Sequence, residues 1–350
     1  MTILVTGGAG YIGGHTTLAL LDRGLHPVIL DDLSSGDGSF VPKNVPLVVG
    51  DIGDRELVAG IIRKNKIDTI LHFAAKVDVA ESFADPLDCY LNNTVKAQSI
   101  IQAAVENGVR NFILSSTAAV YGHSDSAPVE ETAPLVPISP YGWSKLMTED
   151  ILRDAHAADG LNYAILRYFN VAGADPHLRY GQVTRKATHL IRMALAAALG
   201  ERQFIEIYGD DYPTPDGTCI RDFIHVSDLA SAHILALDHL DGAQNGITLN
   251  CGYGRGYSVR EVLSAVEGVT GRTLQKRVIK RRIGDPVSLV ADNRRLLALG
   301  WKPQFDNLST IVEHAWKWEL ALAKRPPVPN GQLGTRRGPA GNPADRTDIG

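Results

Sequence analysis

Two side chains that could carry acid–base chemistry lie four residues apart, Tyr141 and Lys145 in the segment Tyr-Gly-Trp-Ser-Lys. Residues at this spacing share one face of a helix. A tyrosine with its ordinary pKa of ~10 is a poor base at neutral pH. A nearby ammonium favours the phenolate and lowers that pKa, and a second positive charge beside the ring would add to this effect. We therefore predict that Tyr141 removes a proton from an alcohol or sugar hydroxyl while hydride leaves the same carbon.

Thr117 is the third candidate, because it follows a predicted strand at 109–115 in the sequence Ser115-Ser116-Thr117. From there its hydroxyl can hydrogen-bond both the reacting oxygen and the tyrosine. Lys145 can also hold a ribose hydroxyl of a bound cofactor. The Tyr-xxx-Lys spacing alone is common on exposed helices, so the prediction depends on the motifs upstream.

Those motifs begin with three glycines, Gly7, Gly10 and Gly13, which follow an apolar run at 3–5. Glycine adopts positive φ without steric cost, and a missing Cβ lets a phosphate approach the backbone. The helix that starts here would direct its free N–H groups at that phosphate. Strand, glycine turn and helix together are the dinucleotide-binding fingerprint.

The second apolar run, 27–30, ends at Asp31 and Asp32. A carboxylate about 20 residues past the glycines is placed to accept a hydrogen bond from the adenosine ribose. It would repel a ribose phosphate, so the sequence predicts NAD rather than NADP.

The remaining pattern places these motifs in an α/β fold with a doubly wound parallel (Rossmann) sheet. The expected strands are 3–5, 27–30, 46–50, 68–73, 109–115 and 161–168, and the expected helices 12–23, 55–66, 85–108 and about 141–158. Strict alternation stops after residue 170, and further helices are expected at 186–200, 227–240, 293–299 and 309–323. We predict an NAD-binding domain at 1–170 and a smaller C-terminal substrate-binding domain at 171–324 whose segments can cross back. Residues 325–350 have almost no large apolar side chains, which predicts a disordered tail.

Composition narrows the possible partners and compartment. The 350 residues carry a net charge of -4 with a pI of about 6.3, which favours neither nucleic acid nor an anionic membrane as a partner. No apolar run reaches the ~18 residues of a membrane span. The three cysteines, Cys89, Cys219 and Cys251, lack metal or redox spacing, and the eleven histidines show no ligand motif. With a first strand that leaves no signal peptide, we expect a cytoplasmic protein without a metal.

The motifs GGAGYIG, SSTAAVYG, YGWSK, RYFN, RDFIHV and RRIGDP occur in an order that resembles the UDP-glucose 4-epimerases, members of the extended short-chain dehydrogenases/reductases. The resemblance spans roughly residues 2 to 320. It implies a homodimer, a tightly held NAD, and a UDP-sugar substrate epimerised at C4 through a transient 4-keto sugar. The implied NAD contacts are Gly7, Gly10, Tyr11, Ile12, Gly13, Asp31, Asp51, Ile52, Phe73, Asn92 and Lys145. The implied UDP-sugar contacts are Thr117, Tyr141, Asn170, Arg221, Arg282 and Asp285, since amides read hydroxyls or uracil and guanidinium groups pair with phosphate.

Two departures from the family pattern leave the identity of the substrate sugar undecided. Relatives often carry a lysine where this chain has Val77, whereas Lys76 stands one place earlier, and Leu289 occupies the position of a sugar-gating tyrosine. UDP-N-acetylglucosamine and UDP-xylose or UDP-arabinose epimerases therefore remain alternatives.

Three other enzyme classes and a non-catalytic binding protein fit these residues less well. Nucleotide-sugar dehydratases place Asp-Glu after the threonine and decarboxylases keep the Glu, whereas Ala118 and Ala119 cannot transfer protons. A simple reductase would release its cofactor in each cycle. An NAD-sensing binding protein would tend to lose one of Tyr141, Lys145 and Thr117.

Overall fold

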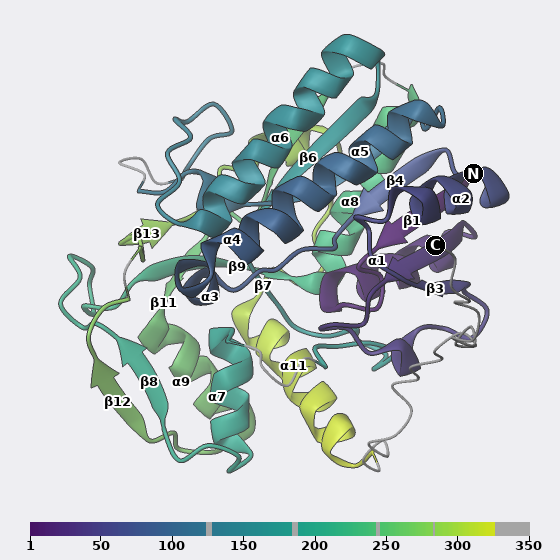
Figure 1. Cartoon of the computed structure of the whole chain (residues 1–350). Helices are drawn as coiled ribbons and strands as arrows, with labels where there is room; N and C mark the ends of the chain where they lie inside the picture. The colour runs from purple at the N-terminus through teal and green to yellow at the C-terminus, as the bar shows by residue number, and fades with distance from the viewer. Residues whose placement is uncertain (124–127, 184–187, 243–245, 283, 326–350) are drawn as a thin grey trace, which may run out of the picture.

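The structure is a computed structural model that describes residues 1–123, 128–183, 188–242, 246–282 and 284–325 (Figure 1). Apart from Arg325, the predicted tail lies outside the described residues. So do residues 186 and 187 of the helix expected at 186–200.

A seven-stranded parallel sheet forms the centre of the molecule. Its spatial order is β10 (Ile247–Cys251), β6 (Asn162–Tyr168), β5 (Asn111–Thr117), β4 (Thr69–His72), β1 (Thr2–Thr6), β2 (His26–Asp31) and β3 (Leu47–Val49). Most of these strands are buried on both faces, which is why they read as continuous apolar runs in the sequence. The predicted doubly wound α/β fold is confirmed.

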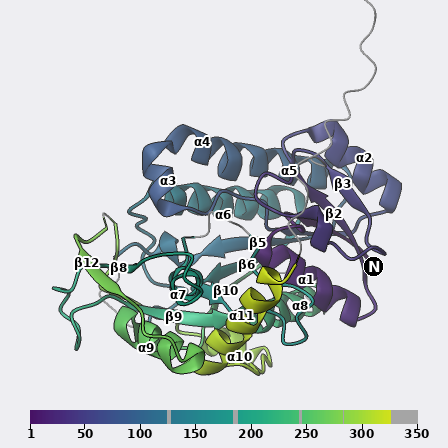
Figure 2. The ribbon, with the colours of Figure 1, turned by 90° about the horizontal axis from the view of Figure 1, so that it is seen from below.

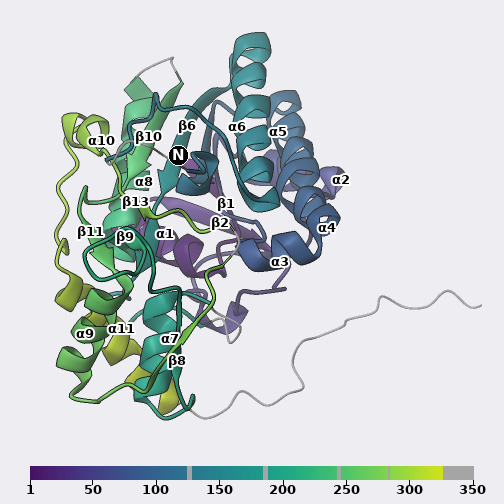
Figure 3. The same ribbon diagram turned by 90° about the vertical axis from the view of Figure 1, so that its left-hand side faces the viewer.

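Helices cover both faces of this sheet (Figure 3). Successive residues of β1 alternate between two cores, because strand side chains point to opposite faces. Ile3 and Val5 pack on one side with the core that includes Leu229 of α8, and Leu4 packs on the other with Val58 of α2. The first face carries α1 (Tyr11–Asp22) and α8 (Val226–Gly242), and the second carries α2 (Arg55–Asn65), α5 (Lys96–Glu106) and α6 (Pro140–Asp159).

The helix expected at 85–108 is confirmed between Pro86 and Glu106, where α4 (Pro86–Tyr90), a π-helical turn η2 (Leu91–Val95) and α5 follow one another without a gap. Helix α3 (Val79–Ala84), just before it, was not predicted. Asp78 caps the start of α3 through the amides of Ala80 and Glu81. Asp85 leaves the helical conformation before Pro86, as residues preceding proline tend to do. A π-helical turn inside a helix is frequent at functional sites.

The second half of the chain builds two small sheets with helices around them (Figures 1 and 2). One sheet contains β7 (Asn170–Ala172), β9 (Ile220–His225), β11 (Gly256–Ser258) and β13 (Ser288–Leu289). The other pairs β8 (Ile205–Tyr208) with β12 (Lys276–Ile279). The helices are α7 (Leu190–Ala198), α9 (Val259–Thr270), α10 (Arg294–Ala298) and α11 (Leu308–Ala323).

Two elements of the second half, β10 and α8, belong spatially to the large sheet. The division into 1–170 and 171–324 remains a prediction, with these two elements on the far side of the boundary. Among the described helices, none is long and apolar enough to cross a membrane.

Candidate active site

The three predicted glycines meet in one tight turn between β1 and α1. Gly7 has φ +69, and a Cβ there would lie 2.7 Å from the backbone nitrogen of Ala74. A Cβ on Gly13 would overlap the carbonyl oxygen of Gly7. Gly10 is the N-cap of α1, so the first-turn amides of Tyr11 and Ile12 have no partner within the helix. This cradle, which a side chain would fill, fits a dinucleotide pyrophosphate.

Asp31 holds the glycine turn against the end of β2. Its carboxylate accepts the backbone N–H of Ala9 at 2.9 Å and of Leu33 at 2.8 Å. Burial raises the pKa of Asp31 above its ordinary value. An ionised carboxylate has further lone pairs, so Asp31 can still accept a ribose hydroxyl as the sequence predicts.

The other predicted cofactor residues are spread around this turn. The hydroxyl of Tyr11 donates to the carbonyl of Gly173 at 2.6 Å, so it is directed toward the second half of the chain. Ile52 is buried in the core, and the Phe73 ring packs against His233 with centroids 4.8 Å apart. A role for Tyr11 in cofactor binding would therefore use its backbone amide.

Asp51 and Asn92 meet at the ammonium group of Lys96, which donates to Asp51 at 2.6 Å and to Asn92 at 2.9 Å. The side-chain amide of Asn92 also donates to the Asp88 carboxylate at 2.9 Å. The side chain of Asn92 is thus already paired with its own helix and its neighbour.

The predicted catalytic residues come together at the carboxyl end of β5. Tyr141 lies in the first turn of α6, which Ser139 caps through the amide of Gly142 at 3.1 Å. The Thr117 hydroxyl accepts the backbone N–H of Ala119 at 3.1 Å and lies close enough to the phenol of Tyr141 to affect its pKa. One turn later, the ammonium group of Lys145 donates to the carbonyl of Ser115 at 2.8 Å. Helix α6 and strand β5 thus position all three side chains.

The two titrating groups are almost fully buried, and burial sets both pKa values. It raises the pKa of Tyr141 to about 12, against a smaller opposing effect of the nearby Thr117 hydroxyl. It lowers the pKa of Lys145 to about 8. The expected lowering of the Tyr141 pKa is therefore not produced by the protein groups described here.

Sequence reasoning missed Asn93, the buried neighbour of Asn92. Its side chain accepts the backbone N–H of Lys76 at 2.8 Å and donates to the Lys76 carbonyl at 2.8 Å and to Ser144 at 3.1 Å. Asn93 lies on the π-helical turn η2. It ties the segment after β4 to helix α6, next to Tyr141. The adjacent pair of asparagines was the available signal, but sequence alone did not show which one faces inward.

Two of the predicted substrate residues form a pair. The guanidinium of Arg221 donates to Asp285 at 3.0 Å, and both side chains are partly buried. Arg282 stacks over the ring of Tyr208, 3.7 Å from its centroid. A guanidinium held flat on a ring keeps its N–H groups at the edge, where a phosphate can reach them.

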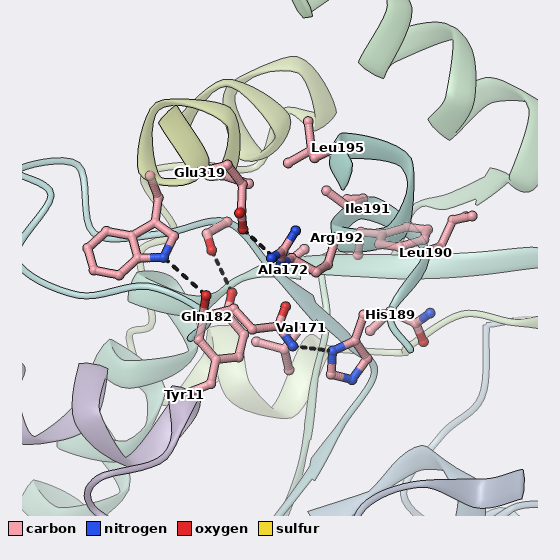
Figure 4. A pocket seen from close by; sticks show the side chains of 15 residues that line it. Tyr11, Val171, Ala172, Gln182, His189, Leu190, Ile191, Arg192, Leu195 and Glu319 are labelled. Atoms are coloured by element: carbon pink, nitrogen blue, oxygen red, sulfur yellow. Dashed lines mark hydrogen bonds and ion pairs between the residues drawn. The ribbon is translucent and has the colours of Figure 1, made fainter. Parts of the chain in front are cut away.

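Asn170 lies apart from that pair, exposed at the start of β7. It lines a small, partly open pocket of about 40 Å³ together with Tyr11, His189 and the ion pair of Arg192 with Glu319 at 3.0 Å (Figure 4). Burial raises the pKa of Glu319 to about 7. This volume holds no more than a water or two.

The two positions that depart from the family pattern differ in their surroundings. Leu289 is buried, pairs with Arg221 in the β13–β9 register and packs in one cluster with Ala118, directly after Thr117. Val77 is 57% exposed, and Lys76 forms an ion pair with Asp88. Leu289, unlike Val77, lies between the predicted nucleotide and catalytic residues.

A glycine cradle, a carboxylate at the end of β2 and a Thr–Tyr–Lys group at the end of β5 define a dinucleotide-dependent enzyme of the short-chain dehydrogenase/reductase type. The model of the NAD dependent epimerase/dehydratase family matches residues 3–252, and the chain belongs to that family. Its cofactor is NAD, as the sequence predicts.

Individual relatives are close. A UDP-glucose 4-epimerase from Azospirillum brasilense is 53% identical over 321 residues, 91% of this chain and 92% of the relative. A crystal structure of UDP-glucose 4-epimerase from Stenotrophomonas maltophila, with bound NAD and formylated UDP-arabinopyranose, has a TM-score of 0.89 at 39% identity and covers 92% of this chain and 99% of its own. The UDP-Glc/GlcNAc 4-epimerase of Campylobacter jejuni has a TM-score of 0.79 at 44% identity, covering 91% and 99%. The predicted resemblance is confirmed.

Proposed function

We propose that this enzyme interconverts UDP-glucose and UDP-galactose through a transient 4-keto sugar, with Tyr141 as the base. The observation that carries the proposal is the meeting of Thr117, Tyr141 and Lys145 at the carboxyl end of β5, two strands from the glycine cradle. When bound, NAD supplies the acceptor and donor of the hydride at C4.

Tyr141 takes the proton from O4, and Thr117 holds that oxygen and the phenol in line. With a pKa of about 12, the buried phenol is not a base by itself. Positive charge must be added close to it, and since Lys145 is already in place, an oxidised nicotinamide is the source. The base therefore becomes effective only with the oxidised cofactor in place.

The binding groups are arranged to hold the nucleotide rather than the hexose. Arg221, Arg282 and Asp285 offer charges and hydrogen bonds suited to a diphosphate and a ribose. Around the predicted hexose position, Ala118 and Leu289 offer apolar surface. A hexose held weakly can turn about its phosphate linkage and present its other face, which a C4 epimerisation without net redox change requires.

The direct test is incubation of purified protein with UDP-galactose and no added NAD, followed by quantification of UDP-glucose. We expect conversion, because bound NAD is restored in each turnover. Heat-denatured protein is the control for carry-over. If no UDP-glucose forms, either without or with added NAD, the proposal is wrong.

A second candidate is a related UDP-sugar 4-epimerase, and Leu289 is the observation that favours it. A leucine occupies less volume than a tyrosine and has no hydroxyl, so it leaves room for an N-acetyl group at this position. Running the same assay with UDP-N-acetylgalactosamine and UDP-xylose discriminates between the candidates. The sugar with the highest kcat/KM identifies the substrate.

We also propose that the enzyme is a homodimer, and an exposed apolar surface supports this. Phe83, Leu87, Leu91 and Val95 follow each other at intervals of four from α3 to the end of η2, and Trp143 and Met147 lie on the outer face of α6. Leu87 is 79% exposed. Contiguous apolar side chains on neighbouring helices are typical of a protein interface.

Replacing two of these residues should separate the subunits. We expect the double substitution Leu87→Glu and Leu91→Glu to convert the dimer to monomers, because buried unpaired carboxylates oppose association. Light scattering coupled to gel filtration gives the mass. Val278→Glu, at an exposed apolar residue of β12, is the matched control and should leave the mass unchanged. A double variant that keeps the mass of the parent protein would place the interface elsewhere.

A further inference from the structure

The segment that follows β7, residues 173–182, lies along helix α1 and is called the brace below. It is tied to the first residue of α1 by the Tyr11 hydroxyl, which donates to the Gly173 carbonyl at 2.6 Å. It is tied to the last residue by Arg179, whose guanidinium donates to Asp22 at 2.8 Å. The brace thus connects the second half of the chain to the helix that starts at the glycine turn.

A third tie reaches the glycine turn itself. The hydroxyl of Tyr180 donates to the carbonyl of Ala9 at 2.7 Å. The same carbonyl accepts the backbone N–H of Asp37 at 3.1 Å, and the N–H of Ala9 donates to Asp31 at 2.9 Å. Ala9 is fully buried, and all its backbone polar atoms are paired. Asp31 and Asp37 belong to the first half of the chain, whereas Tyr180 belongs to the second half.

The ring of Tyr180 is held independently of its hydroxyl. It lies edge-on to His15 with centroids 5.4 Å apart and edge-on to Phe40 at 5.9 Å. Gly14 contacts the same ring and has no room for a side chain. On the far side of Phe40, Trp318 of α11 donates to the Gln182 carbonyl at 3.1 Å. Removal of the hydroxyl should therefore leave the ring in place.

The function of these contacts follows from the position of Ala9. Ala9 lies between Gly7 and Gly10, in the turn that would hold the dinucleotide pyrophosphate. A turn that is already fixed needs less ordering when the ligand binds, and such preorganisation acts mainly on the rate of release. We propose that Tyr180 is a positioning residue for the cofactor, whose hydroxyl fixes the glycine turn from the second half of the chain and slows the release of NAD.

The test is Tyr180→Phe, which removes the hydroxyl and keeps the ring. We expect bound NAD to exchange about tenfold faster, the effect of one lost buried hydrogen bond. The readouts are the NAD content per subunit after gel filtration and the exchange of labelled for unlabelled NAD. Tyr163→Phe makes the same chemical change near the start of β6, at the opposite end of the sheet, and should exchange NAD at the parent rate.

A second variant covers the case in which Tyr180→Phe fails to fold. Tyr11→Phe removes the tie to Gly173, and we expect severalfold faster exchange with a small decrease of the thermal midpoint, because the Gly173 carbonyl loses its partner. A purely structural role for Tyr180 would instead lower the thermal midpoint and leave the exchange rate unchanged, which would overturn the proposal. Equal exchange rates in Tyr180→Phe and Tyr163→Phe would overturn it as well. Because the exchange needs no sugar nucleotide, this result is independent of which sugar is the substrate.

Discussion

Tyr141→Phe should lower kcat by about 100-fold or more while leaving the affinity for UDP nearly unchanged. The substitution removes the only atom of this side chain that can accept the O4 proton. It keeps the ring that packs at the start of α6, where the residue is 9% exposed. Steady-state kinetics with UDP-galactose gives kcat, and titration calorimetry with UDP gives the affinity.

The comparison with Tyr163→Phe separates chemistry from packing, because that side chain lies at the other end of the sheet. We expect its kcat to equal that of the parent enzyme. If UDP affinity collapsed in Tyr141→Phe, the phenol would have a structural role and the proposed mechanism would fail.

Glu149→Ala should lower the free energy of unfolding by about 3–5 kcal/mol, because it leaves a buried guanidinium without its partner. The Glu149 carboxylate accepts Arg167 at 3.0 and 2.7 Å and Ser116 at 2.5 Å. Arg167 is 1% exposed and also donates to the Tyr121 hydroxyl at 3.0 Å. This network joins α6 to β5 and β6, next to the predicted catalytic side chains.

Urea unfolding followed by circular dichroism measures the effect. The control is Asp238→Ala, which breaks a surface ion pair with Arg23. The side chain of Arg23 is 53% exposed and that of Asp238 is 47% exposed. Exposed pairs contribute up to about 1 kcal/mol. A Glu149→Ala loss no larger than that of Asp238→Ala would show that the network adds little to stability.

The strands and helices of the first half could be predicted because their signals are local. The apolar runs at 3–5 and 27–30 correspond to β1 and β2, and the helix expected at 55–66 corresponds to α2 at Arg55–Asn65. Helix α3 and the π-helical turn could not be predicted in this way. Both depend on how the helix packs against its neighbours, which periodicity does not report.

The residues of the candidate site also divide into those with a local sequence signal and those without one. The glycines and the Thr117, Tyr141 and Lys145 group could be predicted as site residues because the proposed chemistry requires particular residue types at fixed spacing. Asn93, Glu149 and Tyr180 were missed, because each acts through partners at least 17 residues away in the chain. Contacts of this kind have no spacing rule and appear only in the folded chain.

The large sheet is completed by β10, which pairs with β6 in parallel from residue 247 onward. During synthesis, β6 must therefore wait for roughly eighty further residues to leave the ribosome before its open edge is covered. Until then it presents unpaired backbone groups that another chain could pair with. Truncations that stop before β10 should accordingly aggregate rather than yield a free nucleotide-binding fragment.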